Sequence, residues 1–129
     1  MKKILVIDDE KDVLTYLDTL LKDNGYTTIL ADKVDDALDQ ARKDRPDLIT
    51  LDITMPEKSG IKAYRAFRED DSLKDIPIVV VTAVTGYAND PESFKKFISS
   101  RKKVPPPDGF IPKPIDRDAL VKTIKDLIG

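Results

Sequence analysis

The chain has 129 residues, and its 40% hydrophobic and 36% charged residues are typical of one soluble domain with its own core. The 22 basic and 24 acidic residues leave a formal net charge of -2, which argues against a nucleic-acid footprint covering the whole domain. There is no cysteine and no histidine, so disulfides, thiolate metal sites and histidine chemistry are excluded, and no apolar run approaches the ~20 residues that span a bilayer.

The chain begins with a short apolar run and an amphipathic repeat. Residues 4–7 are all apolar and end at Asp8-Asp9, which predicts a first buried strand. This run is too short to be the apolar core of a signal peptide, so we expect a cytoplasmic protein. From Lys11 the apolar residues recur at helical spacing, and Asn24-Gly25 is typical of a left-handed helix end.

The most informative stretch comes after a second strand, expected over residues 26–31, and a second helix, expected after Asp32 as a favourable N-cap residue. Residues 48–51 form an apolar run interrupted by a single threonine, and the run ends on Asp52. Met55-Pro56 follows, and a proline cannot donate to a sheet ladder, so the strand must stop there. Asp52 therefore lies at the carboxyl end of a buried strand, where open α/β sheets place their ligands.

The second half of the chain continues the alternation. Ser59-Gly60 opens a third helix, and residues 78–82 form the most strand-like run of the sequence, four β-branched aliphatic residues ending on a threonine. Asp90-Pro91 is typical of a helix start. A short fifth strand is expected over residues 109–112, and Asp116 is expected to cap a last amphipathic helix.

Strand and helix thus alternate five times, which predicts an α/β fold with a parallel sheet covered on both faces, as one domain over residues 1–129. The carboxyl ends of parallel strands share one edge, and there we expect five side chains to meet: Asp8, Asp9, Asp52, Thr82 and Lys113. Crowded carboxylates repel unless a cation lies among them, and oxygen ligands alone suit Mg²⁺ rather than zinc. With a lysine and a threonine for phosphoryl oxygens, the set fits phosphoryl transfer to Asp52 as nucleophile.

These residues resemble the receiver domain of bacterial two-component response regulators, of the single-domain chemotaxis type, and the resemblance covers essentially the whole chain. Four motifs carry it: Val6-Ile7-Asp8-Asp9-Glu10, Leu51-Asp52-Ile53-Thr54-Met55-Pro56 with Gly60, Val80-Val81-Thr82-Ala83, and Phe110-Ile111-Pro112-Lys113-Pro114. The resemblance implies a flavodoxin-like, doubly wound fold, with a five-stranded parallel sheet of order 2-1-3-4-5 and five helices.

By the same resemblance, Asp52 accepts a phosphoryl group from a histidine kinase or a phosphotransfer protein in a Mg²⁺-dependent reaction. Asp8, Asp9 and Asp52 hold the ion together with the backbone carbonyl of Thr54. The resemblance implies a signalling domain that assists its own phosphorylation and slow dephosphorylation, rather than an enzyme with a separate substrate.

The resemblance implies that the remaining site residues respond to the phosphoryl group. Thr82 and Lys113 contact it and Phe110 holds the aromatic switch position, so phosphorylation changes the surface around the fourth and fifth helices for a downstream protein. We expect no direct nucleic-acid contact, no membrane contact, and a monomer or a phosphorylation-dependent dimer. The chain departs from the family pattern over residues 84–108, which look longer than usual. Val84 stands where relatives often carry a polar residue, which predicts slow loss of the phosphoryl group.

Two other functions fit parts of the pattern. A Mg²⁺-dependent phosphatase or phosphotransferase with an aspartyl intermediate would use the same acids, but such enzymes usually carry an Asp-x-Asp pair, whereas Asp8 and Asp9 are adjacent. A pseudo-receiver that only binds proteins would not need the intact set. Each residue also has a plain structural interpretation: the first acids as a helix start, Asp52 as a turn residue, Thr82 as a strand former and Lys113 as a surface lysine.

Overall fold

Five strands form one parallel sheet in the order β2-β1-β3-β4-β5, as the resemblance implied. In chain order they are β1 (Lys3–Ile7), β2 (Thr27–Ala31), β3 (Leu48–Asp52), β4 (Ile78–Thr82) and β5 (Gly109–Pro112). The computed structural model describes residues 2–52, 59–82, 108–112 and 115–129, and only the backbone of residues 59–62, 82, 110 and 112.

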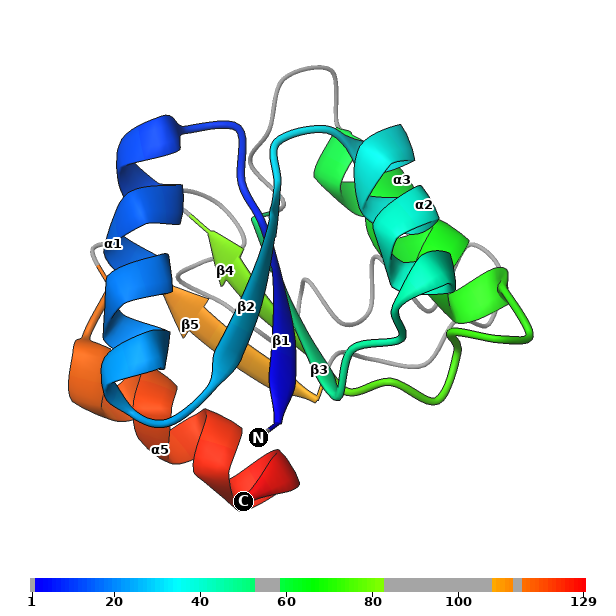
Figure 1. The fold of residues 1–129 in the computed structure, drawn as a ribbon. Helices are drawn as coiled ribbons and strands as arrows, with labels where there is room; N and C mark the ends of the chain where they lie inside the picture. The colour runs from blue at the N-terminus through cyan, green and yellow to red at the C-terminus, as the bar shows by residue number, and fades with distance from the viewer. Residues whose placement is uncertain (1, 53–58, 83–107, 113–114) are drawn as a thin grey trace.

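Helices cover both faces of the sheet, so the doubly wound, flavodoxin-like fold is confirmed. Within the described residues the helices are α1 (Lys11–Asp23), α2 (Val34–Lys43), α3 (Ser59–Glu69) and α5 (Arg117–Ile128). Helices α1 and α5 pack on one face, and α2 and α3 pack on the other (Figure 1). The further helix expected to begin at Asp90-Pro91 lies outside the described residues.

Strand β1 shows why the apolar runs are continuous. Ile4 and Val6 belong to the cluster under α1 and α5, whereas Leu5 and Ile7 belong to the cluster under α2 and α3. None of the four is more than 1% exposed. A central strand of this sheet has no face toward water, so its residues before the carboxyl end are mainly apolar, and Thr50 of β3 buries its hydroxyl.

The first helix ends as the sequence indicates. Gly25 has a φ of 87°, the left-handed conformation that glycine adopts without a steric penalty. The expected start of the second strand at Tyr26 was one residue early. The Tyr26 amide donates to the Leu21 carbonyl at 3.0 Å, so this residue completes the helix end and β2 begins at Thr27.

Of the two predicted N-caps, one is confirmed and one is wrong. The Asp116 side chain accepts hydrogen bonds from two backbone amides of the first turn of α5. In contrast, Lys33 and not Asp32 occupies the N-cap position of α2, and its side chain makes no cap hydrogen bond. Asp35 and Asp36 lie in the first turn of α2, where their charges favour the helix dipole without a side-chain cap.

The parallel arrangement gives the sheet two unlike edges. We call the edge where the strands begin the amino edge, and the edge where they end the carboxyl edge. Helix α5 follows the carboxyl end of β5 and packs along the sheet, with Leu120 and Ile124 fully buried. Among the described residues, no helix combines the length and apolar character that crossing a membrane requires.

Candidate functional site

Strands β1 and β3 are neighbours and bring Asp8 and Asp52 to the carboxyl edge together. Ile7 is paired with Leu51 in the sheet register, so the next residue of each strand emerges side by side. The Asp8 amide continues the ladder by donating to the Ala31 carbonyl at 3.1 Å. Asp8 is 1% exposed and Asp52 is 2% exposed, so both carboxylates are held within the fold rather than in bulk solvent.

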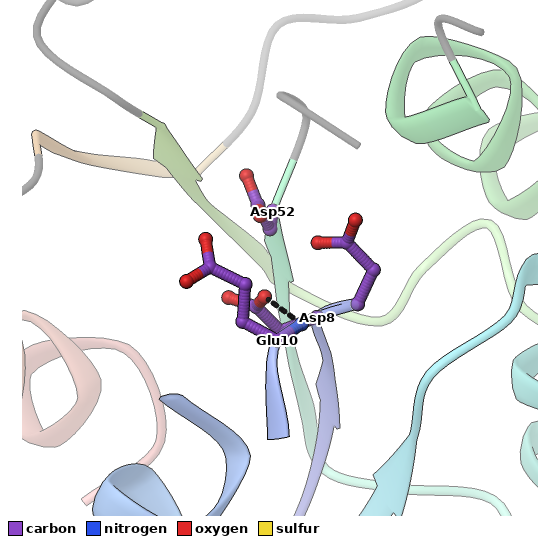
Figure 2. Close-up of side chains that lie close together, drawn as sticks. Asp8, Glu10 and Asp52 are labelled. Atoms are coloured by element: carbon purple, nitrogen blue, oxygen red, sulfur yellow. Dashed lines mark hydrogen bonds between the residues drawn. The ribbon is translucent and has the colours of Figure 1, made fainter. Parts of the chain in front are cut away.

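Four acids converge at this edge. One carboxylate oxygen from each of Asp8, Asp9, Glu10 and Asp52 lies within 4.8 Å of the others. Figure 2 shows the labelled side chains of Asp8, Glu10 and Asp52 gathered where β1 and β3 end. Carboxylates this close disfavour one another's charged forms, and burial adds to that cost, unless a cation is placed among them.

The donor set matches a hard divalent cation. All four side chains offer oxygen, which suits Mg²⁺ or Ca²⁺, and Mg²⁺ typically takes one or two carboxylates and keeps room for waters and phosphate oxygens. Asp9 and Glu10 are exposed, so the cluster is open on the solvent side while Asp8 and Asp52 form its buried wall. The residues present therefore fit the metal that the sequence predicted.

A local turn fixes the acids of β1. The Glu10 amide donates to Asp8 Oδ1 at 2.9 Å, as the dashed line in Figure 2 marks. Glu10 then occupies the N-cap position of α1 without a side-chain cap hydrogen bond. The acidic run is thus a helix start, as the plain structural interpretation held, and a potential ion site at the same time.

The other strand ends reach the same edge. Asp52 is paired with Val81, and Thr82, the last residue of β4, is paired with Pro112 of β5. Phe110 lies in β5 opposite Val80. The backbone of β4 therefore ends beside β3, and that of β5 ends one strand further along the same edge.

Some residues of the predicted site are described by their backbone alone or lie outside the described residues. The side chains of Thr82 and Phe110 are not among those described. Thr54, Lys113 and Val84 lie outside the described residues altogether. Glu10, in contrast, was not predicted as a site residue. Its signal was available, because it directly continues the Asp8-Asp9 pair.

Comparisons with known proteins agree with this geometry. Residues 4–125 match the family model described as the response regulator receiver domain. The chain is 32% identical over 128 residues to the polar-differentiation response regulator DivK of Brucella anthropi, a match covering 99% of this chain and 97% of the relative.

Solved structures give the same result. The chemotaxis response regulator CheY4 of Vibrio cholerae is similar with a TM-score of 0.80 and 28% identity over 98% of each chain. The receiver domain of the Francisella response regulator 1452 has a TM-score of 0.79 and 25% identity, covering 99% of this chain and 97% of that one.

Proposed function

Because the chain belongs to the response regulator receiver domain family, whose members are signalling domains of two-component systems, we propose that Asp52 is its phosphoacceptor. The observation that carries the proposal is the convergence of Asp8, Asp9, Glu10 and Asp52 within 4.8 Å at the carboxyl edge. Receiver domains interact with histidine kinases or phosphotransfer proteins, and we propose that one of these supplies the phosphoryl group.

Phosphoryl transfer to Asp52 needs one covalent step from the protein. A carboxylate oxygen of Asp52 attacks phosphorus, and the bond from phosphorus to the donor nitrogen or oxygen breaks with its electron pair on the donor. The product is an aspartyl phosphate. Asp52 is 2% exposed, so the surrounding sheet holds its carboxylate in a fixed direction. The same burial limits the access of water to the carboxylate.

Asp8, Asp9 and Asp52 would hold Mg²⁺, with the backbone carbonyl of Thr54 as a further ligand. Bound there, Mg²⁺ supplies positive charge against the charge that spreads over the phosphoryl oxygens. The turn between Asp8 Oδ1 and the Glu10 amide keeps the Asp8 carboxylate aimed at this position.

Thr82 and Lys113 complete the proposed chemistry. The hydroxyl of Thr82 donates to one phosphoryl oxygen, and the ammonium of Lys113 pairs with another. Phe110 takes part in the switch, so the surface around the fourth and fifth helices changes for a downstream protein. In support, Thr82 ends β4 beside β3, and Phe110 lies in β5 next to it.

Acetyl phosphate with Mg²⁺ tests the proposal directly. We expect intact-mass measurement to show one added phosphoryl group on the wild-type chain. The adduct should be absent in Asp52→Asn and after chelation of Mg²⁺. Continuous release of phosphate without an adduct would instead indicate a small-molecule phosphatase, and a chain that stays unlabelled would indicate a pseudo-receiver.

The lifetime of the adduct tests a finer point. Val84 follows Thr82 by two residues and carries no polar atom that could place a water for hydrolysis. We therefore expect the phosphoryl group to be lost more slowly from the wild type than from Val84→Glu. Equal lifetimes would remove this part of the proposal.

A further inference from the structure

Strand β5 is the shortest strand of the sheet. It has four residues and lies at the border of the sheet, where β4 is its one partner among the described residues. Residues 83–107 separate it from β4 in the chain, so its pairing with β4 is a contact between segments distant in the sequence. Pro112 also removes one amide from the ladder. A contact at the start of β5 would therefore help to select its register.

Asp108, the residue before β5, makes that contact at the amino edge. Its amide donates to the Ile78 carbonyl at 2.9 Å, and its Oδ2 accepts from the Ile78 amide at 2.9 Å. Asp108 is thereby joined to the first residue of β4 by both its backbone and its side chain. The same Oδ2 accepts from Nη2 of Arg68 at 2.7 Å.

Arg68 is in turn held from three sides. Its side chain is only 6% exposed, and Nη1 donates to the carbonyls of Lys74 and Ile76 at 2.9 and 3.0 Å. The guanidinium carbon lies 5.4 Å from the centre of the Tyr64 ring, within range of a cation–π contact. Arg68 thus joins the end of α3, the segment before β4, and the start of β5 through one set of hydrogen bonds.

A close approach from α5 makes the register selective. A Cβ added at Gly109 would lie 2.8 Å from Cγ2 of Thr123 and 3.1 Å from Cγ2 of Val79. A one-residue slip of β5 would bring Asp108 or Phe110 to this place and exchange the two faces of the strand. Only the observed register presents glycine there.

We propose that the Arg68–Asp108 pair is a positioning device that sets the register of β5 and so aligns Phe110 and Lys113 with the phosphorylation site. The inference rests on the proposed function of Asp52. In the observed register Pro112 is opposite Thr82, and Lys113 is the next residue of the chain. A bond at the amino edge thereby controls chemistry at the carboxyl edge without touching the reacting atoms.

The test separates positioning from plain stability. Arg68→Met removes the pair, and Asp108→Asn is a milder variant because the amide oxygen can still accept from the Ile78 amide. Lys113 is not a proposed ligand of Mg²⁺, so both variants should bind Mg²⁺ by calorimetry within about twofold of wild type. Labelling by acetyl phosphate should fall by at least about tenfold in Arg68→Met, and less in Asp108→Asn.

Hydrogen exchange gives an independent readout. The β5 amides of both variants should lose more protection than the β1 amides, whose exchange follows only the loss of global stability. Arg42→Met, which removes the more exposed Arg42–Asp70 pair, is the matched control and should change neither labelling nor β5 exchange.

Each other outcome has a definite meaning. Wild-type labelling in both variants would overturn the inference and leave the proposed function intact. Parallel losses of Mg²⁺ affinity and labelling would show general destabilisation and would also overturn it. A wild-type chain that is never labelled would instead refute the proposed function.

Discussion

The amino edge and the carboxyl edge of one sheet use charge in opposite ways. At the amino edge, the buried guanidinium of Arg68 donates to Asp108 and to two backbone carbonyls, so its charge is matched within the chain. At the carboxyl edge, four carboxylates gather within 4.8 Å, and Asp8 and Asp52 are buried. The first arrangement holds the fold together, whereas the second accumulates charge of one sign that suits a bound ion.

The largest effect is expected from replacing the proposed nucleophile at the carboxyl edge. Asp52→Asn should abolish labelling, because the amide lacks a nucleophilic carboxylate oxygen. In chelator, the same variant should be more stable than wild type by about 1 kcal/mol, since one buried like charge is removed. Urea unfolding with and without Mg²⁺ measures this change, with Asp126→Asn on the exposed face of α5 as control. A loss of stability in chelator would contradict the idea of repulsion.

Removing the charged pair at the amino edge should instead lower the free energy of unfolding. Arg68→Met leaves the carbonyls of Lys74 and Ile76 without their donor, so we expect a loss of about 2 kcal/mol in the free energy of unfolding. Asp108 keeps 38% of its side-chain exposure, so water screens part of the cost. Thermal and urea unfolding measure the loss. Arg42→Met should cost less than about 0.5 kcal/mol, and equal losses in the two variants would remove the distinction between the pairs.

Thr50, which lies in β3 two residues before Asp52, sharpens the comparison. Its Oγ1 is buried and has no hydrogen-bond partner in the part of the chain that the structure describes. Replacing the hydroxyl by a methyl group in Thr50→Val should therefore stabilise the fold by about 1 kcal/mol. Urea unfolding measures this gain. A destabilised Thr50→Val variant would mean that the hydroxyl has a partner, such as a buried water, near Asp52.

Glu10 tests how far the charge at the carboxyl edge extends. Its carboxylate belongs to the acidic group but the residue is exposed, so water screens its attraction for the ion. Glu10→Gln should weaken Mg²⁺ binding by about threefold, with a smaller effect at high salt. Calorimetric titration at two ionic strengths measures both. An effect as large as that of Asp9→Asn would make Glu10 a direct ligand.

The smallest effect is expected away from both edges, between α1 and β2. The hydrogen bond from the Thr28 hydroxyl is the main cause that holds the pKa of Asp18 below its usual value of 3.8, and Lys22 assists. A lowered pKa adds stability above the usual value, and this stability is lost as the pH falls through the lowered pKa. Thr28→Val should raise the Asp18 pKa toward 3.8, as measured by NMR titration. An unchanged pKa would assign the shift to Lys22.

The parts of the fold that follow from local pattern were predictable. The four β-branched residues of β4 and the apolar run of β1 have no alternative to burial on both faces, and their ends place Asp8 and Thr82 at one edge. The cap of α2 was misassigned because Asp32 and Lys33 adjoin, and only the backbone decides which residue begins the helix.

Contacts between distant segments were not predictable. In the sequence, Arg68 is an ordinary basic residue in the last turn of α3 and Asp108 is a turn residue. Their pairing spans 40 positions, and no periodicity encodes it. Glu10 was missed for a different reason, because exposed acids at a helix start are usual without a ligand.

The packing of α5 also has a consequence for biosynthesis. Leu120 and Ile124 complete the cover over Val6 and Val79, so this face of the sheet is finished only by residues translated after all five strands. While the ribosome is still making the preceding strands, that apolar surface is bare, and nascent intermediates of this kind attract chaperones or aggregate. A translational pause just before α5 should therefore lower the soluble yield more than a pause just after it.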